Sequence, residues 1–164
     1  MEMDKYDKDK GGEFMRLTIK KFNELTTKEL YTISRERFEV FVCEQKITCE
    51  NEFDNRDEKS IHLYVEEGEK FVGYLRILPK GLEYDDAPAI GRVLITKEFR
   101  RKGIAQIMLR AAIKYVKENF DDDILKLSAQ QYVKSLYEEV GFTVCSEPYE
   151  EAGIPHVEMI CKIK

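Results

Sequence analysis

The sequence AIGRVLITKEFRRKGIA, residues 89–105, decides the fold that we expect for this chain. Its first seven residues are nearly all apolar, as in a strand that is covered on both faces. Gly91 within them indicates a bulge or a close backbone approach. A short basic turn follows, and beyond it apolar residues recur at helical spacing to about residue 120. The stretch therefore predicts a strand, a turn and the start of a helix.

The turn, Arg100–Ala105, is predicted to bind an anion. The first N–H groups of a helix have no partner within the helix, and the helix dipole adds positive potential there. Gly103 allows an anion to approach the backbone closely, and Ala105 keeps the next turn nearly bare. The cationic side chains beside it are those of Arg100, Arg101 and Lys102. Such amides hold phosphate oxygens, so a pyrophosphate is the anion that fits best.

Composition limits the class of protein. The 164 residues, 43% of them hydrophobic, fit one domain with a sizeable core. The net charge of −5 argues against a general nucleic-acid binder, for which a basic surface is expected. No apolar run is long enough for a membrane span and no N-terminal segment has the pattern of a secretory signal, so the cytoplasm is the expected location. The cysteine spacing and the two histidines do not fit a zinc site, and no metal is expected.

Residues 1–14 are expected to form a disordered leader ahead of a single domain over residues 15–164. Asp and Lys alternate in the leader with almost no apolar residue, so it buries too little surface to offset the entropy of ordering. Met15 is an equally suitable start, in which case the preceding residues are a remnant of an expression tag.

Apolar patterning predicts a mixed α/β domain. Thr26 and Glu29 form a capping-box pattern ahead of an expected helix over residues 30–43. Helical spacing predicts a second helix after the basic turn and a short third helix that ends at Gly141. The expected strands are residues 17–22, 61–65, 71–78, 89–95, 124–129, 142–145 and 157–163. This order predicts helices packed on one sheet.

The acidic stretch from Glu44 to Glu58 has two interpretations. A run of charges is usually a solvated loop or a short helical turn. Clustered carboxylates also raise the local concentration of cations, so the stretch is alternatively one wall of a pocket for a cationic amine. The sequence leaves both interpretations open.

Residues in and after the turn resemble a known family. The pattern Arg100-x-x-Gly103-x-Ala105 between a strand and a helix, followed by Gln130, Tyr137 and Gly141-Phe142, is similar to the signature of the GNAT N-acetyltransferase superfamily. Stretches similar to its small ElaA-like and YjcF-like bacterial branch are Arg37-x-x-Val40-Phe41-Val42-x-Glu44-Gln45, the acidic stretch to Asp54, His62, Gly91-Arg92-Val93, Leu127–Gln130 and Gly153–His156. The resemblance covers about residues 15–164. It implies the acyl-CoA N-acyltransferase fold, with a central, mostly antiparallel sheet of six to seven strands flanked by helices.

The resemblance implies acetyl-CoA as cosubstrate and a primary amine, on an unidentified small molecule or protein, as acceptor. In the family, the strand before the turn pairs with the pantetheine arm, a role that falls here on Val93, Leu94 and Ile95. The pyrophosphate falls on the amides of Arg101, Lys102, Gly103, Ile104 and Ala105, with Arg100 beside them. Gln130 stands where many members have an asparagine that contacts the cofactor. Tyr137 matches the tyrosine that protonates the departing CoA thiolate.

Amine acetylation needs an acid and a base. Tyrosine, with a reference pKa of about 10, is protonated at neutral pH and suits donation to a thiolate. The candidate bases that would take the proton of the amine are Glu44, His62, His156 and Glu158. Each candidate also has an ordinary structural explanation, as Tyr137 has on an apolar helix face. Cys43 lacks a flanking base pattern and is expected to be a small buried residue rather than an acyl-carrying nucleophile.

Two other functions stand as alternatives to the enzyme. A CoA-binding module with little catalysis, such as a sensor, fits the same cofactor site, because a fold does not by itself establish turnover. Another kind of nucleotide binder is disfavoured, because residues 100–105 lack the ending of a phosphate loop and the further glycines of a dinucleotide fingerprint. No residue pattern decides between a monomer and a homodimer.

Overall fold

The computed structural model describes residues 2–6 and 14–164. In this part of the chain nine strands form one sheet, in the order β1-β2-β3-β4-β5-β6-β9-β7 with β8 paired to β9. Neighbouring strands are antiparallel except for β5 and β6, which are parallel. The strands are β1 Glu2–Tyr6, β2 Met15–Lys21, β3 Ile61–Glu67, β4 Lys70–Leu78, β5 Ala89–Ile95, β6 Ile124–Gln130, β7 Thr143–Val144, β8 Tyr149–Glu151 and β9 Ile154–Lys162.

The expected mixed α/β fold is confirmed, but the sheet is larger than the six to seven strands predicted. The additional strands are β1 and β8. The sequences of β1 and β8 show no apolar alternation. Strands at a sheet edge are held largely through backbone hydrogen bonds, which no side-chain pattern reveals. β1 lies within the expected leader and pairs with β2, Glu2 opposite Thr18. The remainder of that prediction, residues 1 and 7–13, lies outside the described residues.

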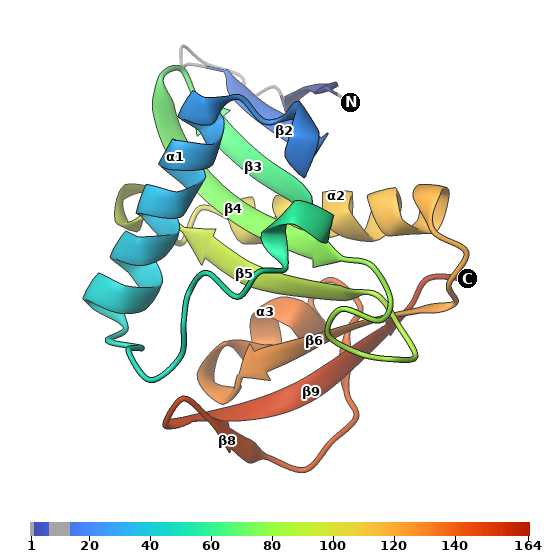
Figure 1. The fold of residues 1–164 in the computed structure, drawn as a ribbon. Coiled ribbons are helices and arrows are strands. Elements are labelled where there is room, and N and C mark those ends of the chain that lie inside the picture. Colours follow the sequence, from blue (N-terminus) through green and yellow to red (C-terminus); the bar gives the residue numbers. More distant parts are fainter. Residues whose placement is uncertain (1, 7–13) are drawn as a thin grey trace.

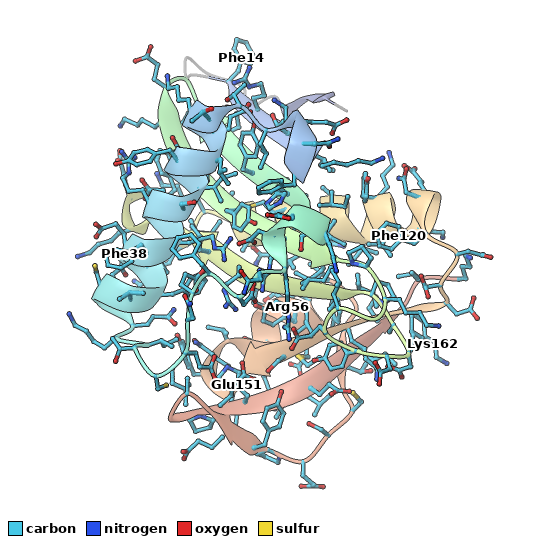
Figure 2. All side chains as sticks on the ribbon, viewed as in Figure 1. Phe14, Phe38, Arg56, Phe120, Glu151 and Lys162 are labelled. Carbon is cyan, nitrogen blue, oxygen red and sulfur yellow. The ribbon has the colours of Figure 1, made fainter. Side chains whose placement is uncertain are left out.

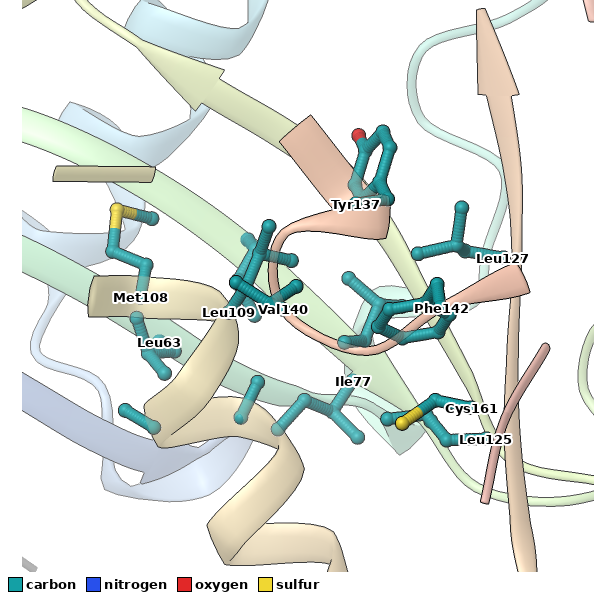
Figure 3. Close-up of a cluster of buried hydrophobic side chains, with 14 of the residues drawn as sticks. Leu63, Ile77, Met108, Leu109, Leu125, Leu127, Tyr137, Val140, Phe142 and Cys161 are labelled. Carbon is teal, nitrogen blue, oxygen red and sulfur yellow. The ribbon is translucent and has the colours of Figure 1, made fainter. Parts of the chain in front are cut away.

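Two helices cover opposite faces of the sheet (Figure 1). Tyr64 of β3 packs with Ile33 of α1, whereas the neighbouring Leu63 packs in the larger core with Met108 of α2. Figure 3 shows that larger core, which lies between α2, α3 and the sheet. β3 and β4 are buried on both faces over residues 61–65 and 72–78, where His62 and Arg76 are the polar residues within the apolar runs.

The helical elements are α1 Thr27–Arg37, α2 Ile104–Asn119 and α3 Lys134–Glu138, with the π-helix η2 Phe38–Glu44 and the short 3-10 turns η1 Phe22–Glu24, η3 Asp57–Lys59, η4 Lys97–Phe99 and η5 Gln131–Val133. Among the residues that the structure describes, no helix is long and apolar enough to cross a membrane.

The capping box predicted for α1 is confirmed. The Glu29 N–H donates to Thr26 Oγ1 at 3.2 Å, and the Thr26 N–H donates to Glu29 Oε2 at 2.8 Å. The expected helix over residues 30–43 is regular only to Arg37, after which η2 continues as a π-helix. Such wider turns are frequent at functional sites. This one brings its last residue, Glu44, to the cleft described below.

Two irregularities beside β5 shape the sheet. Tyr74 lies opposite Leu94 but Arg76 lies opposite Gly91, so β5 has one extra residue there, and Arg92 has a positive φ of 55°. This confirms the break predicted from Gly91. On the other side, β5 and β6 pair in register at Ala89 and Lys126 and separate beyond that point. The backbone edge of β5 after the bulge is thereby left open.

Candidate functional site

A cleft of about 1170 Å³ opens where β5 and β6 separate. Of the predicted cofactor-binding residues, those that line it are Val93, Leu94, Ile95, Arg100, Arg101, Gly103, Ile104, Ala105 and Gln130. Of the predicted catalytic residues, those that line it are Glu44, Tyr137 and His156. Lys102 is not part of the lining, and its Nζ lies 4.8 Å from the centre of the Phe99 ring. The cleft brings together segments that are far apart in the sequence.

The basic turn has the geometry expected of an anion site. Gly103 is in the left-handed conformation, with φ of 75°, and α2 begins at the next residue. A Cβ on Gly103 would have no atom within 4 Å, so the position needs glycine for its backbone angle and for access rather than for packing. The first amides of the sixteen-residue helix α2 lie along the cleft.

Two side-chain contacts join η2 to the other walls of the cleft. Arg100 donates through Nε to the Ile95 carbonyl oxygen at 2.9 Å and through Nη2 to Glu44 Oε2 at 2.8 Å. Gln130 Nε2 donates to Gln45 Oε1 at 3.0 Å. Two residues predicted to contact the cofactor are therefore held by neighbouring residues at the end of η2, and the Glu44 carboxylate faces a cation.

Tyr137 lies at the end of α3 with 7% of its surface exposed. Its ring meets Phe142 edge-on, with ring centres 6.3 Å apart. Figure 3 shows its hydroxyl on the side of the ring away from Phe142 and Val140. Burial, with a smaller contribution from Tyr132, raises the pKa of Tyr137 to about 12. The phenol is therefore fully protonated at neutral pH, as a proton donor must be.

His156 lies on β9 across the cleft and is buried. Its Nδ1 lies 2.7 Å from the Ile154 carbonyl oxygen, which can only accept a hydrogen bond. In neutral His156 the proton is therefore on Nδ1, and Nε2 keeps a free electron pair. The ring stacks on Tyr149, with ring centres 6.1 Å apart.

A polar group from β6 and β8 lies beside His156. Ser128 Oγ donates to Glu151 Oε2 at 2.9 Å and lies 2.5 Å from the Tyr149 hydroxyl. Glu151, labelled in Figure 2, and Ser128 both line the cleft. Among the described residues no cationic side chain pairs with Glu151. The sequence did not predict this cluster of polar side chains. The residues of β8 have no strand pattern, so nothing in the sequence indicated that Glu151 would line the cleft.

The other candidate bases lie elsewhere. His62 is fully buried beneath the acidic stretch, with Nδ1 2.8 Å from the Tyr74 hydroxyl and Nε2 2.9 Å from the Asp57 carbonyl oxygen. Burial lowers the pKa of His62. Glu158 points to Lys126 at 3.4 Å and is not part of the cleft lining. The half-buried thiol of Cys43 is outside the lining as well.

The acidic stretch is solvated in part, with Glu50 and Glu58 exposed and the expected short helical turn formed at η3, but its other carboxylates do not make a free anionic wall. Three of its carboxylates form an arginine–carboxylate network, whose members are Arg37, Arg76, Arg92, Glu52, Asp54 and Asp57. Arg37 and Arg76 are each 2% exposed. Arg37 donates to Glu52 at 2.6 Å and to Asp57 at 2.8 Å. Three cations thus face three carboxylates, and Glu52, which lines the cleft, is already neutralised.

Charges in the network are held ionised by their partners. Burial by itself would raise the pKa of Asp54, but the hydrogen bonds and charge of Arg76 outweigh it and hold the pKa at about 2. For Arg37, burial opposes the charge, yet Tyr74, Glu52 and Asp57 raise its pKa. Arg76 within the apolar run of residues 71–78 was a sequence signal for this network, because a buried arginine needs carboxylate partners.

Comparison with known proteins decides the family. The family model described as an acetyltransferase (GNAT) domain matches residues 29–163. This chain belongs to the GNAT acetyltransferase family. The GNAT chain is 33% identical over 147 residues to the uncharacterized N-acetyltransferase YjcF of Bacillus subtilis, covering 89% of this chain and 99% of that protein.

Solved structures agree with this assignment. An acyl-CoA N-acyltransferase from Pseudomonas aeruginosa matches the GNAT chain with a TM-score of 0.80 and 31% identity, covering 88% of this chain and 98% of the other. Escherichia coli ElaA matches with a TM-score of 0.83 and 27% identity, covering 90% and 99%. The resemblance to the ElaA-like and YjcF-like branch is confirmed, and membership supports acyl-CoA-dependent acyl transfer and CoA binding by this GNAT domain.

Proposed function

We propose that this GNAT domain transfers the acetyl group of acetyl-CoA directly to a primary amine. The observation that supports this most is the single cleft that contains the Arg100–Ala105 turn, the open edge of β5 and Tyr137. These are the three parts that bind a pyrophosphate, align an extended pantetheine arm and supply a proton. The cleft residues suit a nucleotide-bearing thioester by their chemistry: helix amides for phosphate and free strand amides for the arm.

In this proposal the amides of residues 101–105 and the Arg100 side chain bind the pyrophosphate. The open edge of β5 at Val93, Leu94 and Ile95 pairs with the pantetheine arm, as an added strand would. Gln130 orients the arm from the opposite wall. Glu44 holds Arg100 in place through their ion pair of 2.8 Å. The thioester would then lie beside the bulge in β5.

The chemistry is a direct transfer. The amine nitrogen attacks the thioester carbonyl carbon, a C–N bond forms, and a backbone N–H beside the bulge stabilises the negative charge on the oxygen. His156 Nε2 takes the proton of the amine, because its electron pair is free while Glu44 is engaged by Arg100. The C–S bond then breaks, and Tyr137 donates its proton to the thiolate. Proton exchange with solvent restores both side chains.

Ligand binding and thiol release test the proposal. CoA at a hundred times its Kd should stabilise the protein by about 2.7 kcal/mol, which raises Tm by roughly 5–10 °C, whereas ATP and NAD should not. Release of thiol from acetyl-CoA, and from longer acyl-CoA thioesters for comparison, is then measured over a panel of amines. Stabilisation by CoA without release would favour the sensor, and no stabilisation by CoA would refute the cofactor site.

Tyr137→Phe should reduce kcat by about 100-fold, at the lower end of what a positioned general acid contributes. The Kd for CoA should stay within about twofold, because the ring and its packing on Phe142 are kept. Steady-state thiol release and a CoA titration measure the two effects. Unchanged turnover would mean that water or another group protonates the thiolate.

A further inference from the structure

The wall of the cleft formed by β4 and β5 presents hydrogen-bond donors that the protein does not use. Arg92 on the bulge lines the cleft and is one quarter exposed. Its Nε donates to the Glu52 carboxylate at 3.0 Å. Its Nη2 lies 3.7 Å from Asp54 Oδ2, too far for a hydrogen bond. Within residues 14–164 no hydrogen bond uses its terminal nitrogens, so the outer side of this guanidinium is available to a ligand.

Arg76 supplies a second unused donor on the same wall. It is 98% buried and lines the cleft, and its Nε is the one buried side-chain nitrogen or oxygen without a hydrogen-bond partner in the described part of the chain. A buried N–H is rarely left unsatisfied. Gly91 lies opposite Arg76 in the sheet, and a Cβ there would stand 3.8 Å from this Nε. The nitrogen is itself buried, so it is an unsatisfied donor behind the wall rather than one that is exposed to the cleft.

The charge around these donors indicates which acceptor group of a ligand they can bind. The arginines of the arginine–carboxylate network balance its carboxylates, three against three, so the wall attracts an oxygen through hydrogen bonds more than through net charge. A carboxylate and a carbonyl oxygen both qualify. Across the cleft, Glu151 has no cationic partner among the described residues and receives a hydrogen bond from Ser128. That wall is suited to an ammonium group.

The position of Arg92 on β5 limits the ligand further. Arg92 directly precedes Val93, where the thioester arm is proposed to begin its pairing. One residue of a strand advances about 3.3 Å. An oxygen bound by Arg92 can therefore lie within one side-chain length of the reacting nitrogen, which favours an acceptor that carries its oxygen near the amine.

We propose, on the basis of the function above, that the acceptor is an amino acid or an aminoacyl compound: an amine whose neighbouring carbon bears a carboxylate or a carbonyl group. The terminal nitrogens of Arg92 donate to that oxygen. Glu151 attracts the ammonium form, and His156 takes the proton from the amine that attacks. Arg92 is then a residue that determines specificity.

Three matched series, each of three compounds, test the inference. For each of leucine, phenylalanine and methionine, kcat/KM for thiol release from acetyl-CoA is measured with the free amino acid, its primary amide and the decarboxylated amine. The acid or the amide should exceed the decarboxylated amine by about 10- to 100-fold, the range for hydrogen bonds to a charged donor. A higher kcat/KM with the acid indicates that the acceptors are free amino acids, and a higher kcat/KM with the amide indicates that they are the N-termini of peptides. Equal or better rates with the decarboxylated amines, or with spermidine, would overturn the inference and leave the acetyltransferase proposal standing.

Two variants assign the preference to Arg92. Arg92→Gln should bring the ratio of kcat/KM between the favoured compound and the decarboxylated amine to about one, and Arg92→Lys, which keeps the ion pair with Glu52, should lower it in the same direction. Arg35→Gln, on the exposed side of α1, is the matched control and should keep the ratio. If no amine releases thiol, the proposed function fails. The inference is then decided by whether the amide raises Tm of the CoA complex in the parent protein but not in Arg92→Gln.

Discussion

Replacing Gly103 with glutamate should raise the Kd for CoA by about 1000-fold. The residue has φ of 75° at the start of α2, and a Cβ there would meet no atom within 4 Å, so the new side chain extends along the cleft rather than into the core. Its carboxylate would then lie near the proposed pyrophosphate. Two like charges about 4 Å apart near a protein surface repel by roughly 4 kcal/mol, which corresponds to that factor. Isothermal titration of CoA measures it.

A matched control separates this repulsion from backbone strain. Gly81 has φ of 88°, an equally open Cβ position and no place in the cleft lining. Gly81→Glu should therefore cost a similar amount of stability and leave CoA binding within about twofold. Gly103→Asn, which suits the left-handed conformation and adds no charge, should weaken binding much less than glutamate does. Tight binding of CoA by Gly103→Glu would place the pyrophosphate elsewhere.

The turn around Gly103 was predictable because its parts are contiguous in the sequence. The apolar strand, the basic residues and the helical spacing stand within one short stretch, and each has a local physical consequence. The bulge in β5 was predictable for the same reason, since a glycine inside a buried strand is a local signal. The capping box of α1 is a third case, because its two residues are three positions apart.

Contacts between distant segments could not be predicted in this way. Arg100 and Glu44 are 56 positions apart, and Gln130 and Gln45 are 85 apart. Their pairing depends on where η2 ends, and the π-helical turn that sets this end has no recognisable pattern in residues 38–44. The acidic stretch shows the same limit. Its sequence indicated carboxylates, but which arginines neutralise them depends on the packing of α1 against the sheet.

Replacing Arg37 with methionine should lower the free energy of unfolding by about 3 kcal/mol. Arg37 is 2% exposed and donates three hydrogen bonds, to the Glu52 carboxylate, the Glu52 carbonyl oxygen and Asp57. Breaking a buried ion pair from one side typically costs about 3–5 kcal/mol, because a desolvated charge is left behind. The lower end applies, since Arg92 still pairs with Glu52 and Arg76 with Asp57. Urea unfolding measures the change.

The control for this loss lies on the same helix. Arg35 is more than half exposed and pairs with Glu36, so Arg35→Met should change stability by less than about 0.5 kcal/mol. The uncompensated charge can then be removed in turn. If the cost arises from the stranded Glu52 carboxylate, adding Glu52→Gln to Arg37→Met should recover part of the loss, although Glu52→Gln alone destabilises the parent protein. A double variant that loses the sum of both single losses would mean instead that Arg37 stabilises the fold through its packing on Tyr74 and Phe53 rather than through its charge.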